Sequence, residues 1–166
     1  MSPFADLLET IAHAPIEKRA VTNYSVLNEA YCYAKPSSFS RGMRIDLGSV
    51  AILLISGTAS IDENGKSVHI GDFRAQMRRT LANITGLLAS EGCTWHDIVR
   101  TTCYLRDIER DYEAFNEERT AFYKEQGLDP LPASTGIQAI LCRPELLVEI
   151  EAIAMFRTDK AATGKE

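Results

Sequence analysis

Apolar and polar residues alternate most regularly near the end of the chain, in residues 147–156. This period of two predicts a β-strand, because successive side chains of a strand point to opposite faces of the sheet. One face of the predicted strand is purely apolar and consists of Val148, Ile150, Ala152, Ala154 and Phe156. The other face carries Glu149 and Glu151 together with the apolar residues Leu147, Ile153 and Met155. Two carboxylates therefore share a half-apolar face.

This face allows two interpretations. On the solvent side of an antiparallel sheet, both glutamates would be ordinary surface residues. Their apolar neighbours instead favour partial burial, which raises the pKa of a carboxyl group and makes it a candidate acid or base. The pattern alone leaves both interpretations open.

The rest of the chain predicts the element order ββ-α-β-α-ββ. Strands are expected at residues 43–46, 49–55, 98–105, 133–141 and 146–156. Residues 51–55 are apolar on both faces, which is typical of a central strand. Residues 1–12 show the spacing of a short helix, whereas residues 13–42 carry few clear signals.

Apolar residues at helical spacing predict two longer helices. The first begins at the N-cap Asp72 and ends at Gly92, with Arg74, Arg78 and Asn83 pointing away from its apolar stripe. The second covers residues 107–126 and is expected to bury Tyr112, Phe115, Phe122 and Tyr123. These elements predict an α+β fold with both helices on one face of the sheet. The other face would remain open unless subunits cover it, so we expect a homo-oligomer.

Composition limits the class of function. The chain has 166 residues, enough for one domain, and its net charge of −5 does not favour a nucleic-acid partner. The four cysteines lack CxxC spacing and the three histidines lack metal-ligand spacing, so we expect free thiols in a reducing cytoplasm, no metal and no cofactor. No apolar run approaches the ~18 residues of a membrane span, and no membrane partner is expected.

Several segments together resemble the RidA (YjgF) family. They are Ser56-Gly57, residues 71–76 with residues 81–84, residues 112–116, Pro132-Ala133 and residues 148–154. The resemblance covers about residues 39 to 155 in the right order. It implies a chorismate-mutase-like fold with a mixed sheet, a homotrimer with a central barrel, and ligand clefts between subunits. The expected division is an N-terminal extension with a short helix (residues 1–38), a RidA-like domain (39–157) and a flexible tail (158–166).

The cleft residues depart from the family pattern at three positions. Relatives that hydrolyse imines and enamines carry an Arg after Pro-Ala, where it binds the substrate carboxylate, and this chain has Ser134 there. A neutral hydroxyl cannot replace a bidentate guanidinium. The usual cleft Tyr corresponds to Phe39, and the common cleft Cys corresponds to Gly136. The standard imine deaminase activity is therefore not what these residues predict.

Other positions match the family or its chorismatase relatives. Ser56, Asn116 and Glu149 match cleft positions, and Glu149 matches the glutamate that orients or activates water. Residues 133–137 and 142–151 resemble the C-terminal half of chorismatases, in which the matching Glu protonates an enol ether. Some chorismatases carry a Cys seven residues before that Glu, as Cys142 is here. The predicted catalytic residues are Glu149 and Cys142, and the predicted substrate-binding residues are Arg143, Ser134, Thr135, Gly136, Asn116, Phe39, Arg41 and Ser56.

Three functions follow from these residues. The first is an enzyme with hydrolase or deaminase-like chemistry on a small unsaturated carboxylate, imine or enolpyruvyl compound, with Glu149 as general acid or base. The second is a non-catalytic trimer that binds a metabolite or a protein in the same clefts. A small-molecule ligand is expected to be a carboxylate. The third is the ribonuclease role attached to some relatives, which the net charge of −5 does not favour.

Overall fold

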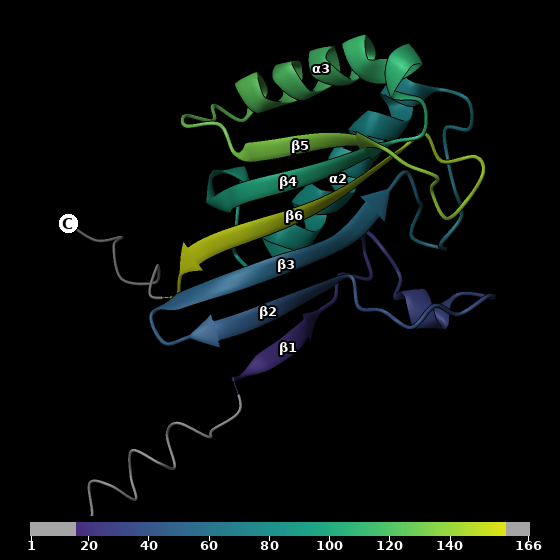
Figure 1. Ribbon diagram of the computed structural model, residues 1–166. Helices are drawn as coiled ribbons and strands as arrows, with labels where there is room; N and C mark the ends of the chain where they lie inside the picture. The colour runs from purple at the N-terminus through teal and green to yellow at the C-terminus, as the bar shows by residue number, and fades with distance from the viewer. Residues whose placement is uncertain (1–15, 159–166) are drawn as a thin grey trace, which may run out of the picture.

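The computed structural model describes residues 16–158 of the chain. Within this range six strands form one mixed sheet in the order β1-β2-β3-β6-β4-β5 (Figure 1). β4 and β5 run parallel, and the other neighbouring strands pair antiparallel. The strands are β1 (Lys18–Val21), β2 (Gly42–Leu47), β3 (Val50–Ala59), β4 (Ile98–Leu105), β5 (Ala133–Gln138) and β6 (Val148–Arg157).

Two α-helices, α2 (Phe73–Ser90) and α3 (Ile108–Glu125), pack on this sheet, which confirms the predicted fold class. Asp72 Oδ1 accepts a hydrogen bond from the Ala75 N–H at 2.9 Å, and Gly92 follows the helix with a φ of 69°. The N-cap and the C-terminal glycine of α2 are therefore the residues that the sequence predicts. In Figure 1, α2 crosses behind the sheet and α3 lies above β5 and β4.

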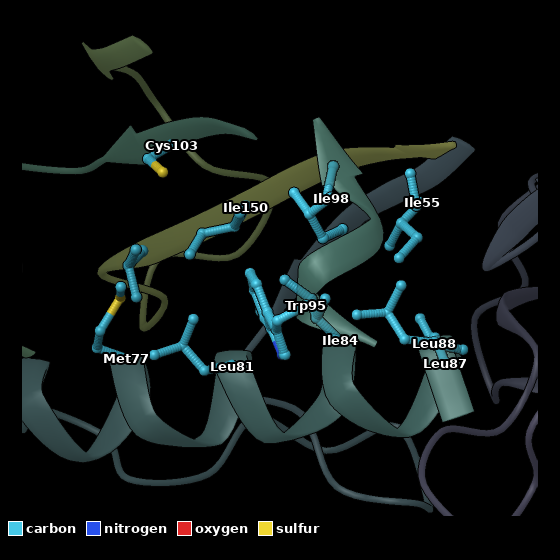
Figure 2. Packing of buried hydrophobic residues seen from close by; sticks show 14 of the residues in the cluster. Ile55, Met77, Leu81, Ile84, Leu87, Leu88, Trp95, Ile98, Cys103 and Ile150 are labelled. Carbon is cyan, nitrogen blue, oxygen red and sulfur yellow. The ribbon is translucent and has the colours of Figure 1, made fainter. Parts of the chain in front are cut away.

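The hydrophobic core lies between α2 and the sheet (Figure 2). Met77, Leu81 and Ile84 of α2 point toward the strands, and Trp95 from the short helix η2 (Trp95–Asp97) fills the space beside them. The indole N–H of Trp95 donates to Thr85 Oγ1 at 2.8 Å, so the polar edge of this buried ring is satisfied. Each apolar side chain of this size stabilises the fold by about 1.5–3 kcal/mol when buried.

β6 lies between β3 and β4 and divides its residues between two faces as the alternation predicts. The apolar face is buried against the helices: Val148, Ile150, Ala152, Ala154 and Phe156. On the opposite face, Glu149, Glu151 and Ile153 are half-buried and Met155 is exposed. β3 pairs with β2 and β6, which confirms that residues 51–55 belong to a central strand.

Two predictions for side chains on the helices are wrong. Asn83 does not point away from the core but is buried, with 1% of its surface exposed. Its Nδ2 donates to the carbonyls of Ala59 and Ile61 at 3.0 and 2.9 Å, so it satisfies the backbone where β3 ends. Tyr112 was expected in the core but is 51% exposed, because Phe115 occupies the core position of that helical face.

The strand boundaries also differ from the sequence prediction. β5 ends at Gln138 instead of residue 141, and residues 139–147 form a loop. β3 continues beyond residue 55 to Ala59 through a bulge. β1 was missed because its four residues, three of them exposed, show no apolar alternation. The short helix η1 (Ala30–Cys32) follows β1. The helix expected in residues 1–12 lies outside the described residues.

The sheet face opposite the helices remains partly apolar in the single chain. Leu54, Ile137 and Met155 are each more than a third exposed there, on β3, β5 and β6. Exposed apolar residues that share a sheet face are typical of a surface that a partner covers. The homo-oligomer stays a prediction from this face and from the resemblance.

Replacing Asn83 with Ala should lower the free energy of unfolding by roughly 1–3 kcal/mol, because two carbonyls at the end of β3 each lose one of their donors. Chemical denaturation measures this difference. Asn64→Ala is the matched control, since Asn64 is exposed in a turn and its change should stay within about 0.5 kcal/mol. Equal losses in both variants would contradict the structural role of Asn83.

Candidate functional site

A β-bulge in β3 creates the space in which the site forms. The register between β3 and β6 shifts between Ile55 and Thr58, so Ser56 and Gly57 lie in an irregular stretch of the ladder. The Ser56 hydroxyl donates to the Ser40 carbonyl at 2.7 Å, which fixes this stretch to the segment before β2. Bulges re-aim side chains beside functional sites, and this one leaves room over β6.

The carboxylate of Glu149 occupies that room. A Cβ added to Gly57 would lie 2.0 Å from Glu149 Oε1, so only a glycine at this position allows the approach. Burial raises the pKa of Glu149 above its ordinary value of 4.5, and the charge of Glu151 on the same face raises it further. Tyr104, opposite Glu149 on β4, also has a raised pKa, from burial and from its hydrogen bond to Glu151.

A segment from the N-terminal part of the chain forms the opposite wall. Arg41 is 3% exposed and donates from Nε and Nη2 to the Asn28 carbonyl at 3.1 and 3.0 Å. It also donates to the Tyr33 hydroxyl, and its guanidinium lies 5.0 Å from the Tyr33 ring centroid and 5.2 Å from that of Phe39. Burial lowers the pKa of Arg41, and the charge of Arg143 acts in the same direction. The two arginines are therefore close enough to repel one another.

Glu29, beside Arg41, is fully buried, and neither of its carboxylate oxygens has a hydrogen bond of normal geometry to a described residue. Burial raises the pKa of Glu29, while the charge and the backbone N–H of Arg41 lower it. Burial is the largest of these influences, so the pKa of Glu29 is raised overall.

Arg143 and Cys142 come from the loop between β5 and β6. The guanidinium of Arg106 holds this loop by donating to the carbonyls of Leu146 at 2.5 Å and Arg143 at 2.6 Å. Arg143 Nη1 donates to the Gly65 carbonyl at 2.8 Å, and its guanidinium lies 5.8 Å from the Tyr33 ring centroid. Cys142 is exposed and is a free thiol.

These groups line one cavity of about 420 Å³. It is lined by Tyr33, Ser37, Phe39, Arg41, Ser56, Gly57, Ala59, Ile61, Cys142, Arg143, Leu146, Glu149 and Glu151. Six of the predicted site residues meet there: Phe39, Arg41, Ser56, Cys142, Arg143 and Glu149. Two cations, two carboxyl groups and two aromatic rings around a cavity of this size suit a small polar molecule.

The other predicted site residues lie in a different part of the chain. Ser134, Thr135 and Gly136 are on the edge strand β5, and Asn116 is on α3. Ser134 accepts hydrogen bonds from Thr101 Oγ1 at 3.0 Å and from Arg119 Nη1 at 3.1 Å, and it lines a second cavity. Within one chain, these four residues do not line the cavity of Glu149.

Sequence reasoning missed Tyr33, Gly57 and Arg119 as residues of these cavities. Gly57 had a readable signal, because a glycine inside a strand often marks a bulge or a close approach. Tyr33 had none, since it lies in the segment without clear periodicity. Arg119 lies on a helix among other charges and was indistinguishable from a solvated arginine.

Among residues 16–158, no group of His, Cys, Asp and Glu side chains could hold a metal ion. None of the helices in that range is long and apolar enough to cross a membrane. In the part of the chain that the structure describes, Cys32, Cys93, Cys103 and Cys142 form no disulfide bond.

Glu149→Gln should stabilise the protein at pH values above the pKa of Glu149. The folded state holds the Glu149 proton more tightly than the unfolded chain, so the wild type loses stability as the pH rises from about 4.5 through the raised pKa. A glutamine never ionises and avoids this loss. We expect a higher melting temperature for the variant at about pH 8 and a vanishing difference below about pH 4. The exposed residue Glu113, changed to Gln, is the control, and equal behaviour of the two variants would contradict the raised pKa.

Comparisons with known proteins find a matching family model and similar relatives. A family model described as Endoribonuclease L-PSP matches residues 34–156. The 3-aminoacrylate deaminase RutC of Acinetobacter baylyi is 34% identical over 103 residues, which are 62% of this chain and 78% of the relative. A RutC family protein of Haemophilus influenzae is 32% identical over 111 residues, 67% of this chain and 82% of the relative.

A solved structure supports the same assignment. The crystal structure of the YjgF gene product of E. coli matches with a TM-score of 0.66 and 25% identity, and the match covers 82% of this chain and 97% of that one. The two helices on a mixed sheet are therefore the fold of the proteins that the sequence motifs resemble. The chain belongs to the Endoribonuclease L-PSP family, which includes the RidA (YjgF) and RutC proteins.

Proposed function

We propose that this protein hydrolyses a small imine, enamine or enolpyruvyl carboxylate, with Glu149 as the general acid and base. The observation that carries this proposal is the half-buried carboxyl group of Glu149, whose pKa is raised and which faces a cavity with Arg41 and Arg143. A carboxyl group with a raised pKa keeps its proton to a higher pH and can donate it to an unsaturated substrate. The relative RutC is a 3-aminoacrylate deaminase, which is chemistry of the same class.

Hydrolysis of an enamine would begin with a proton transfer from Glu149. The protonated carboxyl group gives its proton to the terminal carbon of the C=C bond, which produces an iminium ion. Water then attacks the iminium carbon and passes a proton to the Glu149 carboxylate, which restores the acid. The resulting carbinolamine breaks its C–N bond, its hydroxyl proton moves to the nitrogen, and ammonia and a carbonyl compound leave. No cofactor enters these steps.

Arg143 is the proposed partner of the substrate carboxylate. Its hydrogen bonds to Gly65 and Ser67 use Nη1, so they orient the guanidinium, and Nη2 is the proposed donor to the substrate. The hydrogen bonds of Arg41 use Nε and Nη2 and hold it against Asn28 and Tyr33. Arg41 therefore contributes mainly positive potential, while Arg143 makes the direct contact. Cys142 lies next to Arg143 at the exposed side of the cavity, where it can limit the size of the substrate.

We also propose that the protein works as a homotrimer in the cytoplasm. The open sheet face with Leu54, Ile137 and Met155 is the surface available for its assembly. A cleft between subunits could add Ser134, Thr135, Gly136 and Asn116 of a neighbour to the cavity of Glu149. The net charge of −5 does not favour an RNA substrate in that cleft.

Ser134 favours one alternative, a non-catalytic trimer that binds a small metabolite. Enzymes of the family that this chain resembles carry an Arg at this position, and a hydroxyl group provides no charge for a substrate carboxylate. In that case ligands would raise the melting temperature of the protein without being converted.

Glu149→Gln should lower kcat by about 10²–10⁴-fold, because an amide cannot exchange a proton with the substrate. The measurement is release of ammonia or of the carbonyl product from a panel of imines, enamines and enolpyruvyl compounds. Glu113→Gln, an exposed change on α3, is the control and should keep wild-type turnover. Unchanged turnover of a confirmed substrate by the Glu149 variant would remove Glu149 from the mechanism.

Gly57→Ala should reduce turnover by about tenfold to a hundredfold with little loss of stability. The added Cβ would collide with the Glu149 carboxylate, which is the flexible end of its side chain and moves away at low cost. We expect a melting temperature near that of the wild type and a lower kcat in the same assay. Wild-type kcat in a folded Gly57→Ala variant would show that the position of the carboxylate does not matter.

A further inference from the structure

One wall of the Glu149 cavity depends on residues that precede the family match, which begins at residue 34. The segment between β1 and β2 contributes Tyr33 to this wall, and the Asn28 carbonyl of the same segment accepts two hydrogen bonds from Arg41. In Figure 1 this segment, with η1, lies at the end of the sheet where the arrowhead of β3 lies. The contacts that hold Arg41 therefore lie outside the part of the chain that the family model matches.

Arg41 is buried, but its guanidinium still has free N–H groups. Only 3% of its surface is exposed, and it lines the cavity. Its Nε and Nη2 donate to Asn28 and Tyr33, whereas Nη1 donates to no residue in the described range. Nη1 is also not among the polar atoms that are sealed from solvent without a partner. The N–H groups of Nη1 are therefore open to a molecule in the cavity.

Arg143 presents a second guanidinium to the same cavity. Its Nη1 donates to the Gly65 carbonyl at 2.8 Å and to Ser67 Oγ at 3.2 Å. Between residues 16 and 158, neither Nε nor Nη2 of Arg143 has an acceptor. These two nitrogens form the side of a guanidinium that binds a carboxylate through two parallel hydrogen bonds.

Tyr33 contacts both guanidiniums and holds them in different positions. Its hydroxyl accepts a hydrogen bond from Arg41 Nη2, and the guanidinium carbons of Arg41 and Arg143 lie 5.0 and 5.8 Å from its ring centroid. A Cβ added to Gly65 would collide with the Tyr33 ring, so the ring packs on the backbone that accepts the Arg143 hydrogen bond. The two arginines share no hydrogen-bond acceptor, and each is fixed by its own contacts. They are therefore two anion-binding positions rather than one.

The acidic groups of the cavity come from a different element. Glu149 and Glu151 line it from β6, and the Tyr104 hydroxyl forms a hydrogen bond with Glu151. Arg41 comes from the segment before β2, and Arg143 comes from the loop before β6. A ligand with two anionic groups and a reactive double bond matches this distribution of charge.

We propose that the substrate of this cavity is a small dicarboxylate, with one carboxylate bound by Arg143 and the other by Arg41. This inference rests on the proposed function, because it assigns the substrate class of the same site. The first carboxylate accepts hydrogen bonds from Nε and Nη2 of Arg143, and the second accepts from Nη1 of Arg41. Arg41 is then the residue that selects dicarboxylates over monocarboxylates.

Succinate and succinamate are the probes that test this proposal. They have the same shape, and succinamate carries an amide in place of one carboxylate. Titration calorimetry of the full-length protein should show that succinate binds about tenfold to a hundredfold more tightly. Equal affinities, or no binding of succinate up to about 10 mM, would overturn the proposal. Tighter binding of inorganic phosphate than of succinate would also overturn it, because one doubly charged group would then suit the cavity better.

Variants identify the residue that makes this selection. Arg41→Gln should weaken succinate binding by about tenfold or more and leave succinamate binding within about twofold of the wild type. Arg78→Gln is the matched control, because Arg78 is an exposed α2 arginine that pairs with Glu118. Equal losses for both probes in a folded Arg41→Gln variant would show that Arg41 does not distinguish the second carboxylate.

Tyr33→Phe is a second variant, which leaves Arg41 in place and removes one of its hydrogen-bond acceptors. Its preference for succinate should lie between those of the wild type and Arg41→Gln, and it decides the question if Arg41→Gln does not fold. A wild-type preference in Tyr33→Phe would then count against the proposal. Neither probe contains an imine, enamine or enolpyruvyl group, so failure of the proposed reaction appears only in the turnover of Glu149→Gln and remains a distinct result.

Discussion

The contact between Gly57 and the Glu149 carboxylate is the constraint on which the candidate site depends. β6 is a central strand, so its position is fixed by pairing on both sides. A regular β3 with a side chain at position 57 would fill the space that Glu149 uses. The bulge and the glycine together admit a carboxyl group to a half-buried position, and that position raises its pKa. Backbone geometry in β3 thus determines an acid–base property in β6.

Charged side chains around the same cavity determine its electrostatic potential. The charge of Arg143 lowers the pKa of Arg41, and the charge of Glu29 raises it. The segment before β2, which carries Glu29 and Tyr33, is therefore part of the electrostatics of the site. The family match begins at residue 34, just after these two residues.

Much of the fold followed from the sequence, because it depends on local signals. The alternation in β6, the cap at Asp72 and the glycines after both helices are each read within a few residues. The place of Glu149 on the half-buried face of β6 was predicted for the same reason. Asn83 was misplaced because its role depends on the carbonyls of Ala59 and Ile61, more than 20 residues away. Tyr33 and Arg119 line the cavities only because of contacts between segments far apart in the sequence. The periodicity of the sequence does not predict such contacts.

The separation of the two cavities changes how the missing arginine at position 134 is interpreted. A positive charge is present beside this position all the same: Arg119 donates to Ser134 and has no carboxylate partner among the described residues. A serine is small enough to accept this contact, whereas an arginine at position 134 would place two guanidinium groups against each other. Ser134 and Arg119 therefore form one contact between the edge strand and α3, and the positive charge at this edge of the sheet comes from the helix.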